Sequence, residues 1–179
     1  MTNPREVAHG LGRSRVNFPL CPSMMENSLD RADAALLAQL QRDSSRSIAD
    51  IAGDVGLSPS SCQRRIKALE TSGMIEGYHA RLDPVRIGFD LHALIEISLT
   101  SQNRDVLERF EEAVGRYDEI LECDLMAGHA DYVLRVAARD LQHFDAIHRN
   151  CLSQLPEVAA MRTYFAIRPI KRWSGYPVR

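Results

Sequence analysis

One short segment of the chain carries side chains that could read nucleic acid. A helix beginning at Ser58 would place polar and basic side chains on its outer side: Ser58, Ser60, Ser61, Gln63, Arg64, Arg65 and Lys67. Arginine can bind O6 and N7 of guanine, glutamine can bind the edge of adenine, and serine and lysine suit phosphates or bases. We therefore predict that Ser60, Gln63 and Arg64 contact bases in the major groove of double-stranded DNA, while Ser61, Arg65 and Lys67 hold phosphates.

The surrounding residues predict the helix-turn-helix that would present this face. Ser47 is a typical N-cap for a first helix, which Gly56 would end. Ser58 and Pro59 then mark the start of a second helix. The apolar residues of that helix fall opposite the polar ones, at Cys62, Ile66 and Leu69. The alternative is an ordinary helical hairpin with a solvated charged face, but the combination of cap, turn, proline and basic face favours a DNA reader.

A third helix is predicted before this pair. Apolar residues recur at helical spacing from Leu29 onward, at Ala32, Leu36, Leu37 and Leu40. Their side of the helix would pack across the other two helices. The sequence therefore predicts a three-helix DNA-binding domain over residues 26–76.

Residues 1–25 contain glycines, prolines and scattered arginines without periodicity, and we expect a flexible extension there. Translation starting at Met24 or Met25 would give a protein without it. The alternative is a DNA-seeking arm formed by Arg5, Arg13 and Arg15.

Charge alone does not indicate nucleic-acid binding. The 179-residue chain has a formal net charge of -2. Residues 26–84 hold seven Lys and Arg against nine Asp and Glu, which is again a net charge of -2. Because affinity for DNA depends on the cations that meet phosphates, the basic side chains must be placed locally. One copy would bind weakly, and we therefore expect a homodimer that presents two reading helices.

The sequence gives no support for a metal site, a cofactor or a membrane span. The four cysteines are widely separated and form neither a CxxC pair nor a Cys/His cluster, so we predict no zinc site. Cys62, Cys123 and Cys151 fall among apolar positions and are expected to be small buried hydrophobes rather than redox switches. Since no apolar run could cross a bilayer or serve as a signal peptide, a cytoplasmic location is expected.

The rest of the chain predicts a second domain of strands and helices. Residues 77–90 change to an extended pattern and are expected to form a strand and hinge. Alternating apolar residues predict strands over 91–99, 119–127, 131–138 and 161–167, and helical spacing predicts helices over 106–114 and 141–155. The order βαββαβ over residues 91–179 is that of a ferredoxin-like sandwich. One sheet face would remain uncovered and invites a partner subunit.

From residue 29 to its end the chain resembles the Lrp/AsnC transcriptional regulators. The matching segments are LDRADAALLAQLQRDSSRSIADIA, VGLSPSSCQRRIKALETSGMIEGYHARLDPVRIG, ILECDLMAGHADYVLRV and MRTYFAIRPIKR. The first two resemble the family's winged helix-turn-helix and hinge, and the others resemble its ferredoxin-like regulator-of-amino-acid-metabolism (RAM) domain. The resemblance implies an α+β protein that forms homodimers and often octamers. It also implies a small effector, commonly an amino acid, and activation or repression of promoters.

The resemblance further implies an effector pocket between domains of neighbouring subunits. In the family, this pocket is built from the turn that joins the second and third strands and from the last strand. Carried over residue by residue, it comprises Leu125, Gly128, His129, Ala130, Asp131, Tyr132, Leu141, Thr163, Tyr164, Phe165 and Ala166. The glycine turn would offer backbone N–H groups to a carboxylate, and Asp131 would hold an ammonium group.

The turn departs from the family pattern at one position. The family usually has G-D-x-D there, and in this chain His129 replaces the first aspartate. An imidazole could select a different side chain, make binding respond to pH, or abolish amino-acid binding. Asp131 also has an ordinary alternative role as the cap of the turn.

Two other functions are compatible with parts of this pattern. Siroheme decarboxylases resemble the same two-domain layout and depend on histidines around a tetrapyrrole. This chain has His79 and His129, but MAGHADY occupies residues 126–132, where a histidine-rich stretch is expected. No catalytic triad, phosphate-binding glycine loop or carboxylate pair stands out, so we predict binding rather than an enzyme. The other alternative is an architectural DNA-binding protein without an effector.

Overall fold

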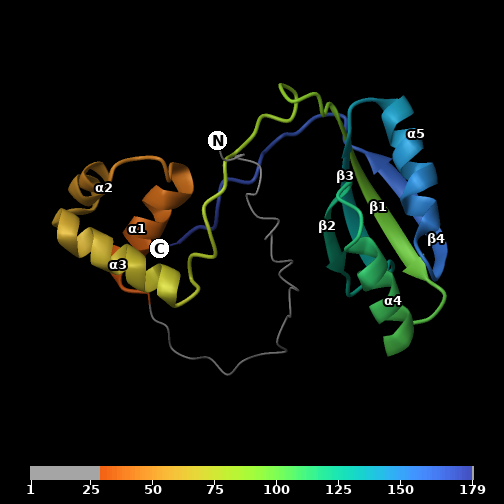
Figure 1. Ribbon diagram of the computed structural model, residues 1–179, viewed down its shortest axis with the longest axis horizontal. Coiled ribbons are helices and arrows are strands. Elements are labelled where there is room, and N and C mark those ends of the chain that lie inside the picture. The colour runs from red at the N-terminus through yellow and green to blue at the C-terminus, as the bar shows by residue number, and fades with distance from the viewer. Residues whose placement is uncertain (1–28, 179) are drawn as a thin grey trace, which may run out of the picture. The chain divides into compact units, whose positions relative to one another are not determined.

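The computed structural model describes residues 29–178, which divide into two compact units (Figure 1). The first unit runs to Glu76 and also takes in the chain from Gly175 onward, and the second spans Gly77–Ser174. The end of the chain therefore groups with the first unit, whereas the sequence assigned all of residues 91–179 to one domain. The extension expected over residues 1–25, with its methionines and Cys21, lies outside the described residues.

The described part of the first unit consists of three packed helices. These are α1 (Arg31–Arg42), α2 (Ile48–Val55) and α3 (Pro59–Thr71). At the start of α2, the Ser47 hydroxyl accepts a hydrogen bond of 3.1 Å from the Asp50 N–H. Gly56 ends α2 with φ +69°, a left-handed conformation that glycine adopts readily. The inner faces of the helices form a core of Leu36, Ile51, Ala52, Cys62 and Ile66. The predicted helix-turn-helix is confirmed.

The chain that follows α3 is not a strand. Residues 72–90, all of which the structure describes, contain no strand within the single chain, and the wing and the hinge strand over residues 77–90 stay a prediction. A strand needs a neighbouring strand to satisfy its N–H and C=O groups, and no segment between residues 29 and 178 pairs with residues 72–90. Turns occupy residues 84–88 instead, where the Phe89 N–H donates to the Pro84 carbonyl at 2.7 Å.

The second unit is, in its described residues, a four-stranded sheet with helices. Its elements are β1 (Leu91–Leu99), α4 (Arg104–Val114), β2 (Ile120–Leu125), β3 (Tyr132–Ala138), α5 (Leu141–Asn150), the short 3₁₀ helix η1 (Leu152–Gln154) and β4 (Val158–Phe165). The strands lie in the order β2-β3-β1-β4, and every neighbouring pair is antiparallel. This order and connectivity confirm the predicted ferredoxin-like sandwich and the α+β class.

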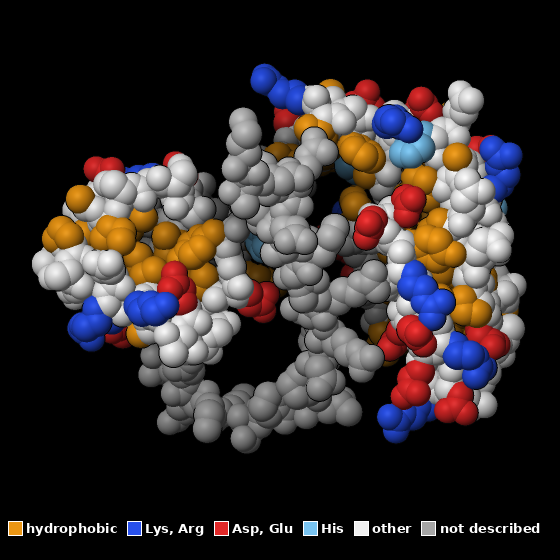
Figure 2. Space-filling model, viewed as in Figure 1, with side chains coloured by type: hydrophobic (Ala, Val, Ile, Leu, Met, Phe, Trp, Pro, Cys, Tyr) orange, Lys and Arg blue, Asp and Glu red, His pale blue; other side chains and the backbone are white. Residues whose placement is uncertain are grey.

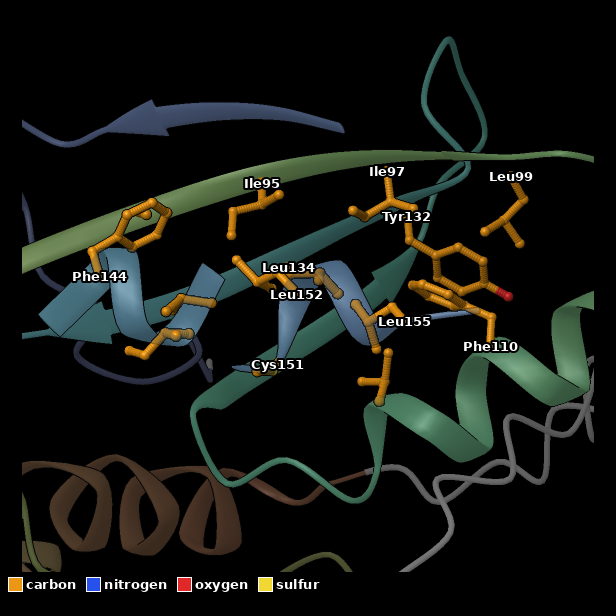
Figure 3. Close-up of a cluster of buried hydrophobic side chains, with 14 of the residues drawn as sticks. Ile95, Ile97, Leu99, Phe110, Tyr132, Leu134, Phe144, Cys151, Leu152 and Leu155 are labelled. Carbon is orange, nitrogen blue, oxygen red and sulfur yellow. The ribbon is translucent and has the colours of Figure 1, made fainter. Parts of the chain in front are cut away.

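The core of the second unit lies between the sheet and its helices. Figure 3 shows Ile95, Ile97 and Leu99 pointing from β1 into a cluster that also contains Phe110 of α4 and Phe144 of α5. Alternate residues of β1 are buried because successive side chains of a strand point to opposite faces of a sheet. The helices therefore cover one sheet face, and the other face carries the intervening residues.

The cysteines of the described chain behave as small hydrophobes. Cys62 and Cys151 are buried, and Cys123 is partly buried against the core of the second unit. Burial raises the pKa of the Cys123 thiol to about 12 and that of the Cys151 thiol to about 11. These thiols therefore remain protonated at neutral pH, which disfavours reactive thiolates and agrees with the predicted packing role.

One predicted strand differs in register. The alternation predicted over residues 119–127 puts Leu121, Cys123 and Leu125 on one side of the strand, but only Cys123 packs against the core, and Leu121 and Leu125 are 55% and 62% exposed. The pairing of β2 with β3 shifts between Ile120 and Glu122. An extra residue in one strand of a pair interrupts the two-residue period, so Leu121 leaves the core side.

Candidate DNA-binding helix and effector site

The outer face of α3 presents the residues predicted to read DNA. Ser60, Gln63, Arg64 and Lys67 are exposed, while Cys62, Ile66 and Leu69 on the opposite side are buried. None of the ion pairs among the described residues involves Arg64. Lys67 is 78% exposed and lies 3.7 Å from the Glu70 carboxylate. Their exposure allows Arg64 and Lys67 to approach a DNA duplex, with Gln63 and Ser60 beside them.

Ser58, which the sequence predicts to bind DNA, forms the N-cap of α3. Its hydroxyl accepts a hydrogen bond from the Ser61 N–H at 3.2 Å, and its Oγ lies 3.2 Å from the Ser60 Oγ. Pro59 occupies the first helical position, where no N–H is needed. The cap thus determines where α3 begins and positions Ser60 and Ser61 on its first turn.

Removing this cap should weaken the first unit. Replacing Ser58 by alanine leaves an N–H group of the first turn without its acceptor, and we expect the free energy of unfolding to fall by about 1 kcal/mol. Urea denaturation followed by circular dichroism measures this change. Ser58→Asn, which retains a capping side chain, is the matched control and should preserve most of the stability. Equal losses in both variants would contradict a capping role.

Arg65 is not placed as the sequence predicted. Its guanidinium lies 2.6 Å from the Asp30 carboxylate and 2.8 Å from the Asp33 carboxylate, both at the start of α1. The hydrogen bond from the Asp33 N–H and then the Arg65 guanidinium hold the pKa of Asp30 below its usual value. Arg65 therefore ties α3 to α1 in this structure and is not presented to phosphates, because its position on α3 faces α1 rather than solvent.

The turn between β2 and β3 is closed by backbone hydrogen bonds. The Met126 N–H donates to the Asp131 carbonyl at 2.8 Å, and the Asp131 N–H donates to the Ile97 carbonyl at 2.9 Å. Gly128 and His129 are exposed at its tip, as the predicted turn requires, and Ala130 is partly buried. The turn is thereby attached to β1 and exposes its tip.

The Asp131 side chain already has two partners within the subunit. One carboxylate oxygen accepts from the Leu99 N–H and the other from the Gln102 side-chain amide, both at 2.7 Å. Asp131 thus fastens the turn to the end of β1, which is the ordinary role that the sequence left open. Each oxygen keeps a second lone pair, so an ammonium group would add to these bonds rather than find a free carboxylate.

Tyr132 belongs to the core. Its side chain is 2% exposed, its ring lies 4.7 Å from that of Phe110, and its hydroxyl donates to the Glu111 carboxylate at 2.7 Å. Burial, followed by this carboxylate, raises the pKa of the Tyr132 hydroxyl. A ligand at the surface of the turn does not reach this ring, so Tyr132 supports the turn from beneath.

The remaining residues predicted to bind an effector lie toward the other end of the sheet. Leu141 starts α5 and is exposed. Tyr164 donates from its hydroxyl to Glu96 at 3.2 Å, and Phe165 packs edge-on against Phe144 with ring centroids 5.0 Å apart. Thr163 precedes these residues on β4, and Ala166 follows them with its N–H bonded to the His92 carbonyl.

One subunit does not bring the two groups of effector residues together. Phe165 pairs with Ala93, whereas the Asp131 N–H bonds to Ile97, four residues further along β1. At the rise of a strand this separation is roughly 13 Å along the sheet. Two hollows of about 310 and 250 Å³ open on the surface, the first lined by α4 and the second by α3, and neither contains an effector residue. Within one subunit, Phe165 and the β2–β3 turn therefore do not line one pocket.

The uncovered sheet face combines apolar side chains with paired polar ones. Leu94, 40% exposed, lies between Arg135 on β3 and Tyr164 on β4. Arg135 donates to Glu122 at 2.7 Å. The side of the second unit that faces the viewer in Figure 2 likewise has acidic and basic side chains adjacent to hydrophobic ones. Such a mixture of apolar and satisfied polar groups is typical of protein interfaces.

Within residues 29–178, no group of three or more His, Cys, Asp or Glu side chains could hold a metal ion. No helix of this described part is long and apolar enough to span a bilayer.

Each of the two units matches a known protein family domain. The AsnC-type helix-turn-helix domain matches residues 29–70, and the Lrp/AsnC ligand binding domain matches residues 92–175. The first match covers the three helices and the second covers the ferredoxin-like sheet.

The similarity to individual relatives extends over most of the chain. The Bkd operon transcriptional regulator of Pseudomonas aeruginosa is 37% identical over 150 residues, which are 84% of this chain and 98% of that protein. The leucine-responsive regulatory protein of Escherichia coli is 37% identical over 144 residues, 80% of this chain and 88% of that protein.

The structure of the chain is also similar to solved structures of transcriptional regulators. A Neisseria meningitidis transcriptional regulator in complex with L-methionine has a TM-score of 0.79 at 30% identity, covering 84% of this chain and 97% of its own. An AsnC family transcriptional regulator from Agrobacterium tumefaciens has a TM-score of 0.79 at 35% identity, with 83% and 96% covered.

The helix-turn-helix, the ferredoxin-like sheet and these relatives define a transcriptional regulator and not an enzyme. The chain belongs to the Lrp/AsnC family.

Proposed function

We propose that the protein binds specific double-stranded DNA through α3 and that a small effector, an amino acid, controls this binding. The observation that carries the proposal is the outer face of α3, where Arg64 is exposed and in no ion pair among the described residues, with Gln63 and Ser60 beside it. Arginine and glutamine distinguish guanine and adenine in the major groove. Because a regulator of promoters acts where the chromosome lies, we place it in the cytoplasm.

The effector would bind where the β2–β3 turn of one subunit meets residues of another. Support comes from the separation of the two groups of effector residues, which a second subunit could complete. The exposed tip at Gly128 can offer backbone N–H groups to a carboxylate. The Neisseria relative, whose structure is a complex with L-methionine, makes an amino acid the first class of ligand to test.

Self-association would use the uncovered sheet face. Two copies packed on this face would bury Leu94 and its apolar neighbours and would bring two reading helices to one DNA site. The homodimer is the smallest assembly that does this, and higher oligomers such as octamers would present further readers.

Thermal denaturation with a panel of amino acids tests the effector part of the proposal. A compound that binds the folded protein at ten times its Kd adds about 1.4 kcal/mol of stability. For a chain of this size we expect the Tm to rise by roughly 3–6 °C with the cognate compound. The D-enantiomer of that compound is the matched control. An unchanged Tm with every amino acid would support the architectural alternative and contradict an amino-acid effector.

A further inference from the structure

The C-terminal segment, residues 167–178, carries a concentration of positive charge. From residue 158 onward the chain has five basic residues and no Asp or Glu: Arg162, Arg168, Lys171, Arg172 and Arg179. The whole chain has 22 Lys and Arg against 24 Asp and Glu, so the residues before 158 hold 17 basic against 24 acidic side chains. The end of the chain therefore carries the charge that the rest of the protein lacks for binding a polyanion.

The cations of this segment are available in the structure. Arg168, Lys171 and Arg172 are exposed, and none of them takes part in an ion pair among the described residues. In the helix-turn-helix unit, by contrast, Arg46 is bound to Asp54 and Arg65 to Asp30 and Asp33. Arg31, Arg42 and Arg64 of this unit are exposed and take part in none of the ion pairs among the described residues, so the segment would add its three cations to these.

The end of the segment is held on the reading unit by a specific contact. The Gln41 side-chain amide, in the last turn of α1, donates to the Tyr176 carbonyl at 3.1 Å. The Tyr176 N–H donates back to the Gln41 Oε1 at 2.6 Å. The side chain of Gln41 therefore pairs with both backbone groups of one residue, and the end of the chain lies against α1 (Figure 1).

Gly175 makes this contact possible. Its φ of +106° is in the region that favours glycine. A Cβ at this position would lie 2.5 Å from Gln41 Oε1 and 2.8 Å from Gln41 Cδ, so the Gln41 side chain would have to move away from Tyr176. A glycine that both adopts a left-handed conformation and leaves room for Gln41 indicates a fitted contact.

The contact limits how far along the chain Lys171 and Arg172 can lie from Gln41 of α1. Arg172 and Lys171 stand three and four residues before Gly175. A fully extended chain spans at most about 3.6 Å per residue, so both lie within about 14 Å of the point where the segment meets α1. A reader bound in the major groove has the sugar–phosphate backbone on both sides of it.

We propose that the C-terminal segment is a second DNA-binding element, which Gln41 and Gly175 hold on the helix-turn-helix unit so that Arg168, Lys171 and Arg172 contact the phosphate backbone. The inference rests on the proposed DNA-binding function and adds a contact outside α3. Phosphate contacts carry affinity but no base information, so this element strengthens binding to every sequence. The exposed Ile167, Ile170 and Trp173 make an anionic membrane the main alternative partner, but the docking on the DNA reader favours DNA.

The test compares the full-length protein with Lys171→Gln/Arg172→Gln on two duplexes, its own upstream DNA and random-sequence DNA. Fluorescence anisotropy at several salt concentrations gives Kd and its salt dependence. We expect roughly tenfold weaker binding to both duplexes and a salt slope reduced by about 1.8 per bound subunit, with the ratio between the duplexes unchanged. Arg104→Gln/Arg116→Gln removes the same charge from the start of α4 and from the second residue after its end; it is the matched control and should leave the slope unchanged.

Gly175→Ala tests the docking separately because it removes no charge. We expect it to weaken binding to both duplexes in the same direction as the double variant, with the fold confirmed by circular dichroism. An unchanged salt slope in the double variant, while Arg64→Ala still lowers sequence discrimination, would overturn the inference alone. Failure of the wild-type protein to bind any duplex would overturn the proposed function and this inference with it.

Two further outcomes would overturn the DNA-binding role of the segment and assign it another role. Lys171- and Arg172-dependent binding to vesicles of anionic phospholipid, with DNA binding unaffected, would assign the segment to a membrane. A changed molar mass of the double variant in sedimentation, with a DNA salt slope equal to that of the wild type, would assign it to contacts between subunits.

Discussion

Leu94→Arg should prevent the proposed self-association and weaken binding to the upstream DNA by about a hundredfold. Leu94 lies on the uncovered sheet face beside Arg135 and Tyr164, and it is 40% exposed in the single chain. Two copies packed on this face would bury an arginine next to Arg135 of each chain, and burial of like charges strongly opposes association. A monomer presents only one reading helix to the DNA. Bivalent binding exceeds monovalent binding by roughly 10²- to 10⁴-fold in affinity, and a monomer loses this gain.

Sedimentation velocity measures the assembly, and anisotropy with the upstream duplex measures the affinity. Asn150→Arg adds the same charge at the exposed end of α5, away from the open sheet face, and should change neither quantity. A Leu94→Arg protein that keeps both the molar mass and the affinity of the wild type would contradict association through this face.

Arg64→Ala should lower the discrimination between the upstream DNA and random DNA by about 1–3 kcal/mol while leaving the oligomer intact. Arg64 is exposed on the outer face of α3, opposite the buried Cys62 and Ile66, so its removal leaves the core of the unit unchanged. A bidentate contact of arginine with guanine distinguishes that base from the others, and alanine offers no such contact.

The measurement is the ratio of the Kd values on the two duplexes at one salt concentration. Arg31→Ala, which removes an exposed arginine of α1 that forms no ion pair among the described residues, is the matched control and should keep the ratio. An equal loss of affinity on both duplexes for Arg64→Ala would show that Arg64 contacts only phosphates.

Features with a local signal could be predicted from the sequence. Ser47, Gly56 and Ser58 act through residues two to four positions away, so their types alone indicate where helices begin and end. The alternation of buried residues along β1 likewise follows from the period of a strand. The order of these elements was enough to predict the ferredoxin-like sandwich.

Features that depend on distant parts of the chain could not be predicted in this way. The ion pairs of Arg65 join residues 32 and 35 positions apart, and the pairing of Gln41 with Tyr176 joins residues 135 positions apart. The bulge at Leu121 is set by the pairing of β2 with β3, which no local pattern reveals. Sequence reasoning therefore also missed Gln102 as the partner of Asp131.

The most direct test of the account is binding of the purified protein to its own upstream DNA at defined salt, with and without each amino acid. The account predicts binding that exceeds binding to random DNA and that one amino acid alters. No preference for the upstream DNA at any salt concentration would contradict specific DNA reading by α3. A preference that no amino acid alters would contradict the proposed effector and leave an architectural DNA-binding protein.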